Sequence, residues 1–272
     1  MPWSNLSEES AIINSTLPQT LILAGLDPAG GAGIQADIQA VTALGGHPLP
    51  VVTCLTVQNT HNVYNATPVD PDFIRQQLEC LAKDTPFHAV KTGALGNAQV
   101  VEVVAGFLGN YPDIPLIVDP VIKAAGGGDL ADEALLKRMA ELLFPRADVI
   151  TPNGIELTML GNSDQPDEAA ENLHRSGCPS VLATGGHGSG DFIRNRLYRQ
   201  GQETAEWQIP RRGGEYHGSG CTLAAAIAAG RAAGLNLEQA IEQAQQFVSA
   251  AIAAALQVGS GQPVPNRAAN NK

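Results

Sequence analysis

Short apolar runs alternate with segments of helical periodicity from about residue 20 to residue 258. The first run is TLILA (20–24), and others lie at 51–57, 88–93, 115–120, 147–153 and 180–186. Most of the segments between them, such as PDFIRQQLECLAKD and ADEALLKRMAELLF, repeat apolar residues at the spacing of an amphipathic helix. This order of strands and helices predicts an α/β fold in which helices cover both faces of a mostly parallel sheet.

One stretch breaks the alternation. In FIRNRLYRQGQETAEWQIPR (192–211), polar and apolar residues alternate on both sides of RQGQET, so we expect a β-hairpin near one edge of the sheet. Two helical segments follow, and no linker or second apolar core interrupts residues 20–258. The sequence therefore predicts an N-terminal extension (1–19), one domain (20–258) and a flexible, Gly/Pro/Asn-rich C-terminal tail (259–272).

The composition narrows the classes of protein that the chain can belong to. A net charge of −11 argues against a nucleic-acid-binding surface, because phosphate contacts along a duplex need a basic patch. The four cysteines show no metal-binding spacing, and the acidic start lacks the basic-then-apolar order of a signal peptide. No run of about 18 apolar residues is present to span a membrane. We therefore expect a cytoplasmic protein with small-molecule ligands.

Polar side chains gather where the predicted strands end. They are Asp27, Gln58, Lys91, Asp119, Asn153, Glu156 and Thr184. In open α/β sheets, ligands bind in the crevice beyond the carboxyl ends of the strands. The sequence therefore predicts a binding site at that end of the sheet.

Two glycine-rich turns, GLDPAGGAG (25–33) and HGSGC (217–221), lead into predicted helices. The first is not a Walker loop, since Gly31 and Ala32 stand where Lys and Ser/Thr are required, and it lacks the GxGxxG spacing. The second also lacks the lysine of a Walker loop. In each, amide groups at a helix start are suited to binding an anion, although a tight turn needed only for packing explains them equally well. His217 is expected only to pack beside the second turn.

Several acidic residues and one cysteine have both a structural and a functional interpretation. Asp37, expected in the first turn of a helix, either complements the helix dipole or accepts a hydrogen bond from a substrate hydroxyl. Asp119 and Glu156 either bind Mg²⁺ or stabilise a turn and a helix start, the latter together with Asn153. Cys221 is either a small thiol that fills a gap or a thiol whose pKa a helix N-terminus lowers from about 8.5 toward neutrality.

Six motifs together resemble the hydroxymethylpyrimidine/phosphomethylpyrimidine kinases of thiamine biosynthesis, which belong to the ribokinase-like family: AGLDPAGGAGIQADIQAVTALGG, LTVQNT, VDPV, TPNGIEL, TGGH and HGSGCTLAAAIAA. The resemblance covers residues 20–257. It implies a three-layer α/β/α fold, ATP and Mg²⁺ as co-substrates, and a homodimer. The implied activity is ATP-dependent phosphorylation of 4-amino-5-hydroxymethyl-2-methylpyrimidine and then of its monophosphate.

The resemblance also implies roles for individual residues. The pyrimidine pocket would be lined by Gly25, Ala32, Asp37, Gln58, Ala94 and Val121. Gly218, Gly220 and the Cys221 amide would form an anion hole for the phosphoryl group, and the Cys221 thiol would accept the hydroxymethyl proton. Asp119 and Glu156 would act through Mg²⁺, whereas Asn153 and Thr184 would lie at the nucleotide.

Two departures from the family's usual pattern leave alternatives open. Ala94 stands where many relatives have a larger residue, often Met, and Thr56 stands where they have an apolar one. A wider or more polar pocket would suit a pyridoxal or pyridoxine kinase. A catalytically silent protein that senses the pyrimidine is the other alternative. The glycine-rich segment VIKAAGGGDL (121–130) is expected to form a flap over the site.

Overall fold

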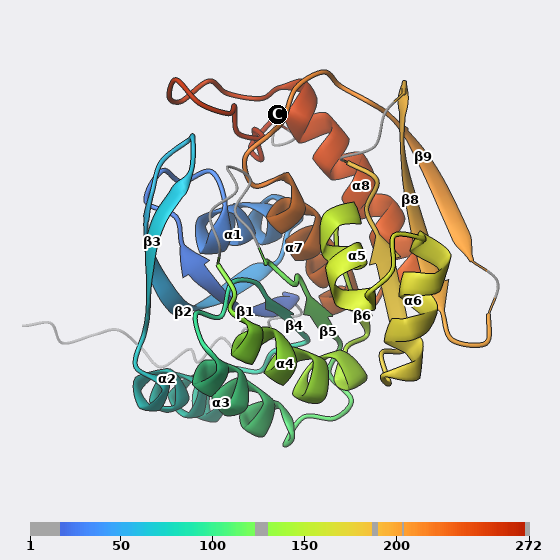
Figure 1. Ribbon diagram of the computed structural model, residues 1–272. Helices are drawn as coiled ribbons and strands as arrows, with labels where there is room; N and C mark the ends of the chain where they lie inside the picture. The colour runs from blue at the N-terminus through green and yellow to red at the C-terminus, as the bar shows by residue number, and fades with distance from the viewer. Residues whose placement is uncertain (1–16, 123–129, 187–189, 203, 270–272) are drawn as a thin grey trace, which may run out of the picture.

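A computed structural model describes residues 17–122, 130–186, 190–202 and 204–269 (Figure 1). Within these ranges one sheet has the strand order β3-β2-β1-β4-β5-β6-β7-β8-β9. Its strands are β1 (Gln19–Leu26), β2 (His47–Gln58), β3 (Val63–Pro68), β4 (Ala89–Thr92), β5 (Leu116–Val118), β6 (Val149–Ile150), β7 (Ser180–Ala183), β8 (Phe192–Arg199) and β9 (Ala205–Pro210). Neighbouring strands from β2 to β7 pair in parallel, and β3, β8 and β9 join in antiparallel pairs.

Helices cover both faces of this sheet. They are α1 (Gly33–Ala43), α2 (Pro71–Asp84), α3 (Ala98–Leu108), α4 (Glu133–Leu142), α5 (Gly154–Gly161), α6 (Pro166–Arg175), α7 (Ser219–Ala232) and α8 (Leu237–Ala253). Figure 1 shows α1, α7 and α8 on one side of the sheet and α2, α3 and α4 on the other. The structure thus confirms the predicted three-layer α/β/α fold.

The alternation of side chains along β1 explains why apolar clusters form on both faces of the sheet. Leu21 and Leu23 face the core under α2–α6, whereas Ile22 and Ala24 face the core under α1 and α7, because successive residues of a strand point to opposite faces. Helix α7 is buried along Thr222–Gly230, and its alanines let it pack closely against the sheet. Close packing of α7 fixes the position of its N-terminus at the carboxyl ends of the strands.

The two edges of the sheet differ in how well the sequence predicted them. The hairpin β8–β9 lies at one edge, as expected. The opposite edge is β3, which we did not predict, because three of the six residues of VYNATP are exposed and only Val63 is buried. Most of the expected flap (121–130) is made up of residues 123–129, which lie outside the described part of the chain. Residues 1–16 of the expected N-terminal extension lie outside it as well.

The expected flexible tail differs from the structure over residues 259–269. Leu256 and Val264 form an antiparallel bridge, and the side chain of Arg267 is buried with 3% of its surface exposed. Its guanidinium donates to Thr222 Oγ1 over 2.8 Å and to the carbonyl oxygen of Gly31. Gly, Pro and Asn predict irregular backbone correctly here, but one buried arginine holds that backbone in place.

In the part of the chain that the structure describes, no helix combines the length and apolar character needed to cross a bilayer.

The contact between α5 and α6 depends on a glycine. A Cβ added at Gly161 would lie 2.5 to 2.6 Å from backbone and side-chain atoms of Ala169. We therefore expect Gly161→Ala to lower the free energy of unfolding by about 1–3 kcal/mol, the usual cost of overpacking. The control is Gly106→Ala on α3, where an added Cβ meets no atom within 4 Å and helix propensity should raise stability by up to about 1 kcal/mol. Urea unfolding measures both; equal effects would contradict the packing argument.

Candidate active site

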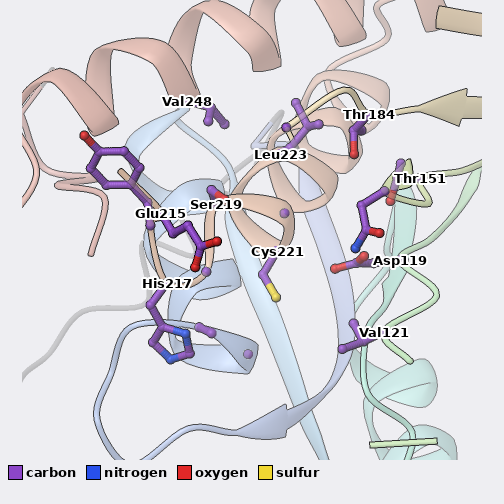
Figure 2. A pocket seen from close by; sticks show the side chains of 18 of the residues that line it. Asp119, Val121, Thr151, Thr184, Glu215, His217, Ser219, Cys221, Leu223 and Val248 are labelled. Atoms are coloured by element: carbon purple, nitrogen blue, oxygen red, sulfur yellow. The ribbon is translucent and has the colours of Figure 1, made fainter. Parts of the chain in front are cut away.

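A cavity of about 440 Å³ opens at the carboxyl ends of the parallel strands (Figure 2). Its lining includes every residue that the sequence analysis placed in the site except Asp37, namely Gly25, Ala32, Gln58, Ala94, Asp119, Val121, Asn153, Glu156, Thr184, Gly218, Gly220 and Cys221. These residues come from both glycine turns and from the ends of the strands. The rule that ligand sites of α/β sheets lie beyond the strand ends therefore predicted the place correctly.

The structure does not place Asp37 in the cavity. Helix α1 begins at Gly33, so Asp37 lies beyond its first turn, with a side chain that has no exposed surface. There Asp37 Oδ2 accepts a hydrogen bond from Lys91 Nζ over 2.7 Å. Burial raises the pKa of Asp37 to about 6, although the ammonium of Lys91 opposes this rise. Any effect of Asp37 on a substrate must therefore act through Lys91.

Lys91 connects that buried carboxylate to the floor of the cavity. Its Nζ lies 3.9 Å from Asp119 Oδ2, and its side chain is fully buried. Burial alone would lower the pKa of Lys91, but Asp37, Cys221 and Asp119 raise it above its usual range, so the residue is a cation. Burial raises the pKa of Asp119, while Lys91 and a hydrogen bond with Cys221 act in the opposite direction.

Cys221 lies in the first turn of α7, with its sulfur directed into the cavity (Figure 2). Burial is the largest influence on its thiol and, together with the negative charges of Asp119 and Asp37, raises the pKa to about 12. Lys91 and a hydrogen bond from Gly33 act the other way but do not outweigh burial. The expectation of a pKa lowered toward neutrality is wrong, because it counted the helix N-terminus and left out the buried surroundings.

The two glycine turns touch each other at the start of α7. Gly218, the N-cap of α7, has φ = 83°, which favours glycine. A Cβ added there would lie 2.0 Å from the carbonyl oxygen of Gly31. The next amide groups, those of Ser219, Gly220 and Cys221, belong to the first turn of a helix, where N–H groups have no partner within the helix. They belong to residues that line the cavity, so an anion there would meet several donors.

Glu156 has the structural role that the sequence left open, and the cavity reaches it as well. Asn153 Oδ1 accepts from the Glu156 amide, and Glu156 Oε2 accepts from the Asn153 amide over 2.9 Å, which forms a capping box. Glu156 Oε1 also accepts from the Ile122 amide over 3.3 Å. Burial and then the charge of Asp119 raise the pKa of Glu156 to about 8. The two carboxyl groups repel each other, and a cation between them would relieve this.

The donors present fit a magnesium ion that is held mainly by its substrate. Asp119 Oδ2 is buried and makes no hydrogen bond with the described residues. Within those residues no group of three or more His, Cys, Asp or Glu side chains is suited to hold a metal. Mg²⁺ bound to nucleotides commonly uses only one or two carboxylates together with phosphate oxygens and water. Asp119 and Glu156 supply that number.

Sequence reasoning missed a pair of side chains that joins the two glycine turns. His217 Nε2 lies 2.8 Å from Asp27 Oδ2, and it also lies 3.0 Å from Gln58 Nε2. Burial would raise the pKa of Asp27, but hydrogen bonds from His217 and from the Ala32 and Ala29 amides lower it. Asp27 and His217 are far apart in the sequence, so no local spacing could reveal the contact.

A group of apolar side chains in the cavity lining was also missed. Its lining includes Ile193, Ile209, Leu223, Val248 and Ile252 from β8, β9, α7 and α8, and Figure 2 shows Leu223 and Val248 across from Thr184. These residues follow ordinary strand and helix patterns, which do not separate a ligand-binding apolar face from a packed one. The cavity therefore joins the Cys221 end to a region by Thr184 where apolar side chains lie together with the polar Asn195 and Arg211.

The model of the phosphomethylpyrimidine kinase family matches residues 27–266 of the chain. The chain belongs to the phosphomethylpyrimidine kinase family. Among curated relatives, a hydroxymethylpyrimidine/phosphomethylpyrimidine kinase of Synechococcus elongatus is 37% identical over 252 residues, which cover 90% of this chain and 95% of the relative. The thiamine biosynthesis bifunctional protein ThiED of Geobacter sulfurreducens is 40% identical over 248 residues. This second match covers 89% of the chain but only 50% of that protein, so the chain spans about half of its length.

The structure of this phosphomethylpyrimidine kinase family member is similar to solved structures of two kinds of kinase. A pyridoxal kinase from Staphylococcus aureus, in complex with AMP-PCP and pyridoxal, has a TM-score of 0.85 and 26% identity, covering 94% of this chain and 95% of that one. A phosphomethylpyrimidine kinase from Clostridium difficile has a TM-score of 0.74 and 29% identity, covering 86% and 99%. The family, the ribokinase-like fold and the assignment as a phosphotransferase that the sequence motifs implied are confirmed.

The raised pKa of Cys221 predicts how the thiol reacts. Iodoacetamide attacks the thiolate, so the rate of alkylation at Cys221 should keep rising through pH 10, without a plateau near neutrality. The exposed Cys80 on α2 serves as the reference thiol. Peptide mass spectrometry after timed labelling gives both rates. Restricted access would lower the rate at Cys221 but would not change its dependence on pH, so a plateau below pH 8 would contradict the raised pKa of the thiol.

Proposed function

We propose that the protein transfers the γ-phosphoryl group of ATP to the hydroxymethyl group of 4-amino-5-hydroxymethyl-2-methylpyrimidine, and then phosphorylates the monophosphate to the diphosphate. The observation that carries the proposal is the single cavity that joins the Gln58 and Cys221 end to the Thr184 end. Such a cavity suits two substrates that meet at the start of α7. Membership of the family, and relatives named for this activity over nearly their whole length, support it.

The two ends of the cavity suit the two proposed substrates. Gly25, Ala32, Gln58, Ala94 and Val121 would surround the pyrimidine, and Gly25 has no room for a side chain because an added Cβ would lie 2.6 Å from Cys54 Sγ. At the other end, Asn153 and Thr184 would contact the nucleotide, and the apolar side chains there would receive its base. The AMP-PCP in the pyridoxal kinase of similar structure supports ATP as the phosphoryl donor.

Asp119 and Glu156 would hold Mg²⁺. When bound, the ion neutralises charge on the phosphates and makes their transfer easier. The two carboxylates would orient that charge at the floor of the cavity, and Lys91 would fix the position of Asp119 from below.

Catalysis would rest on positioning more than on a strong base. Amides of Gly218, Gly220 and Cys221 would stabilise charge on the phosphoryl group as it moves. Because this transfer passes through a loose transition state, the hydroxyl proton leaves late. Cys221 would accept it, while the thiol's own proton passes to an oxygen of the phosphoryl group. A Cys221→Ala enzyme with wild-type kcat would end this assignment.

A homodimer in the cytoplasm is the assembly and location that we propose. Leu55 and Val57 on β2 expose 51% and 60% of their surfaces at the β2–β3 edge, and Tyr64 on β3 exposes 63%. Leu55 and Val57 alternate with Thr56 and Gln58, which line the cavity, so they face away from the substrate. An exposed apolar edge of this kind is typical of a subunit interface. The requirement for ATP and the four free cysteines suit the cytoplasm.

ADP release distinguishes the candidate activities. With Mg–ATP, we expect turnover with the hydroxymethylpyrimidine and with its monophosphate, and at least tenfold lower kcat/KM with pyridoxal, since one mismatched hydrogen bond costs about 1.4 kcal/mol or more. A preference for pyridoxal would show a pyridoxal kinase, which the similar structure from Staphylococcus aureus makes the specific rival. Binding of the pyrimidine in calorimetry without ADP release would show a silent sensor.

The proposed interface predicts the mass of the particle in solution. Light scattering after size-exclusion chromatography should give twice the 28.3 kDa of one chain, and Leu55→Asp with Val57→Asp should give one chain, because two buried charges oppose association strongly. Val258→Asp is the control: it changes an exposed apolar residue, with 53% of its surface accessible, outside the sheet edge. A monomeric wild-type protein would contradict the proposed dimer.

A further inference from the structure

A continuous row of hydrogen-bonding side chains runs along one wall of the cavity. Thr56 Oγ1 lies 2.8 Å from the Leu26 carbonyl oxygen and 3.1 Å from Gln58 Oε1. The Gln58 Nε2 lies 3.0 Å from His217 Nε2, which lies 2.8 Å from Asp27 Oδ2. Each of these contacts needs a donor proton and an acceptor, and the two contacts of His217 Nε2 can draw only on the single proton of that nitrogen. The protons available decide which atom of each pair donates and which accepts.

The Asp27 end determines the role of His217. Asp27 Oδ2 also accepts from the amides of Gly31 and Ala32, over 3.0 and 2.8 Å, and these bonds help to hold its pKa below the usual range. An ionised carboxylate only accepts hydrogen bonds. His217 Nε2 must therefore carry a proton and donate it, whether or not Nδ1 is also protonated. A protonated Nε2 has no lone pair for a donor from Gln58, so Gln58 must present an oxygen there.

The other end leads to the same requirement independently. The Thr56 hydroxyl has one proton, and the Leu26 carbonyl, its nearer neighbour at 2.8 Å, can only accept. Once Thr56 donates to Leu26, its oxygen is left to accept from Gln58. Gln58 must therefore present an N–H group to Thr56. A half-turn of the side-chain amide exchanges its nitrogen and oxygen without moving any other atom. Only the half-turned orientation, with the oxygen at His217 and the nitrogen at Thr56, gives every contact a donor and an acceptor, and the single Nε2 proton of His217 is then shared between Asp27 and Gln58.

We propose that Asp27, His217 and Thr56 are positioning residues that lock the Gln58 amide in this one orientation and thereby select the hydrogen-bonding edge of the substrate ring. The inference rests on the proposed function, because Gln58 lines the end of the cavity assigned to the pyrimidine. The proposal also gives Thr56 a role other than making the pocket polar, since its hydroxyl group makes its hydrogen bonds to Leu26 and Gln58 and not to the ligand. The hydroxyl fixes Gln58, and Gln58 faces the ligand.

A locked amide and a free amide accept different sets of rings. A 4-aminopyrimidine offers a donor on its amino group beside an acceptor on its ring nitrogen. The 4-oxo analogue offers the reverse, an acceptor beside an N–H donor. An amide fixed by its neighbours matches the first pattern and opposes the second, because a buried mismatch leaves polar groups unpaired. An amide that is free to rotate matches either pattern.

The decisive measurement is the ratio of kcat/KM for the 4-amino substrate to kcat/KM for its 4-oxo analogue. Thr56→Val keeps the shape of the side chain and removes the hydroxyl, so the ratio should fall by about tenfold, the effect of one hydrogen bond of about 1.4 kcal/mol. Thr56→Ser keeps the hydroxyl and should keep the ratio within about twofold of wild type. A Thr56→Val enzyme with the wild-type ratio would overturn the proposal, even if its overall rate had fallen.

A second pair of variants tests the other end of the row. His217→Gln retains an N–H group for Asp27 and Gln58 and should keep the ratio, whereas His217→Leu removes it and should lower the ratio in the same way as Thr56→Val. A ratio that His217→Leu leaves unchanged counts against the lock at that end. If the wild-type protein phosphorylates neither pyrimidine, the proposed function fails, and the same ratio is then taken from Kd values measured by calorimetry on the same variants. Equal Kd ratios in wild type and Thr56→Val would overturn the lock itself.

Discussion

The carboxylate of Asp27 holds together the parts of the chain that form the cavity. Oδ1 accepts from the Ala29 amide, while Oδ2 accepts from two further amides of the first glycine turn and from His217 in the second. A buried charge persists only when hydrogen bonds satisfy it, and here the bonds that do so come from both turns. The approach of Gly218 to Gly31, too close for a Cβ, follows from the same arrangement. The start of α7 is thereby fixed beside the start of α1.

Two buried cations show how an acidic protein could offer the proposed site for phosphates. The chain has a net charge of −11, but Lys91 lies beneath Asp119 and Arg267 lies behind the glycine turns, where it donates to Thr222 and Gly31. Both are surrounded by protein, so salt screens them less than it screens surface charges. Net charge therefore describes the behaviour of the whole molecule, whereas the local arrangement of charges and amides decides what the cavity binds.

The sequence predicted the features that depend on local pattern and topology, and it missed those that depend on burial and distant contacts. Alternating apolar runs predicted the parallel sheet, and the strand ends predicted that Asp119 and Thr184 would line one cavity. Asp37 was placed wrongly because helical phase, and not its proximity to the turn, directs its side chain to Lys91. The expected direction of the pKa shift of Cys221 was wrong because the acidic residues near its thiol come from other elements. Arg267 was missed because a single buried side chain holds a segment whose composition suggests a loop.

The similarity to two kinds of kinase indicates which part of the protein distinguishes one substrate ring from another. The chain overlays a pyridoxal kinase with a TM-score of 0.85, yet it shares 37% identity with a pyrimidine kinase across nearly the whole of both chains. The backbone frame therefore does not select between a pyridine and a pyrimidine ring. Both rings carry a hydroxymethyl group, so the phosphoryl-transfer residues do not select between them either. On the proposed function, what remains is the wall that meets the ring edge, where the direction of the protons around Gln58 would decide which pattern of donors and acceptors is accepted.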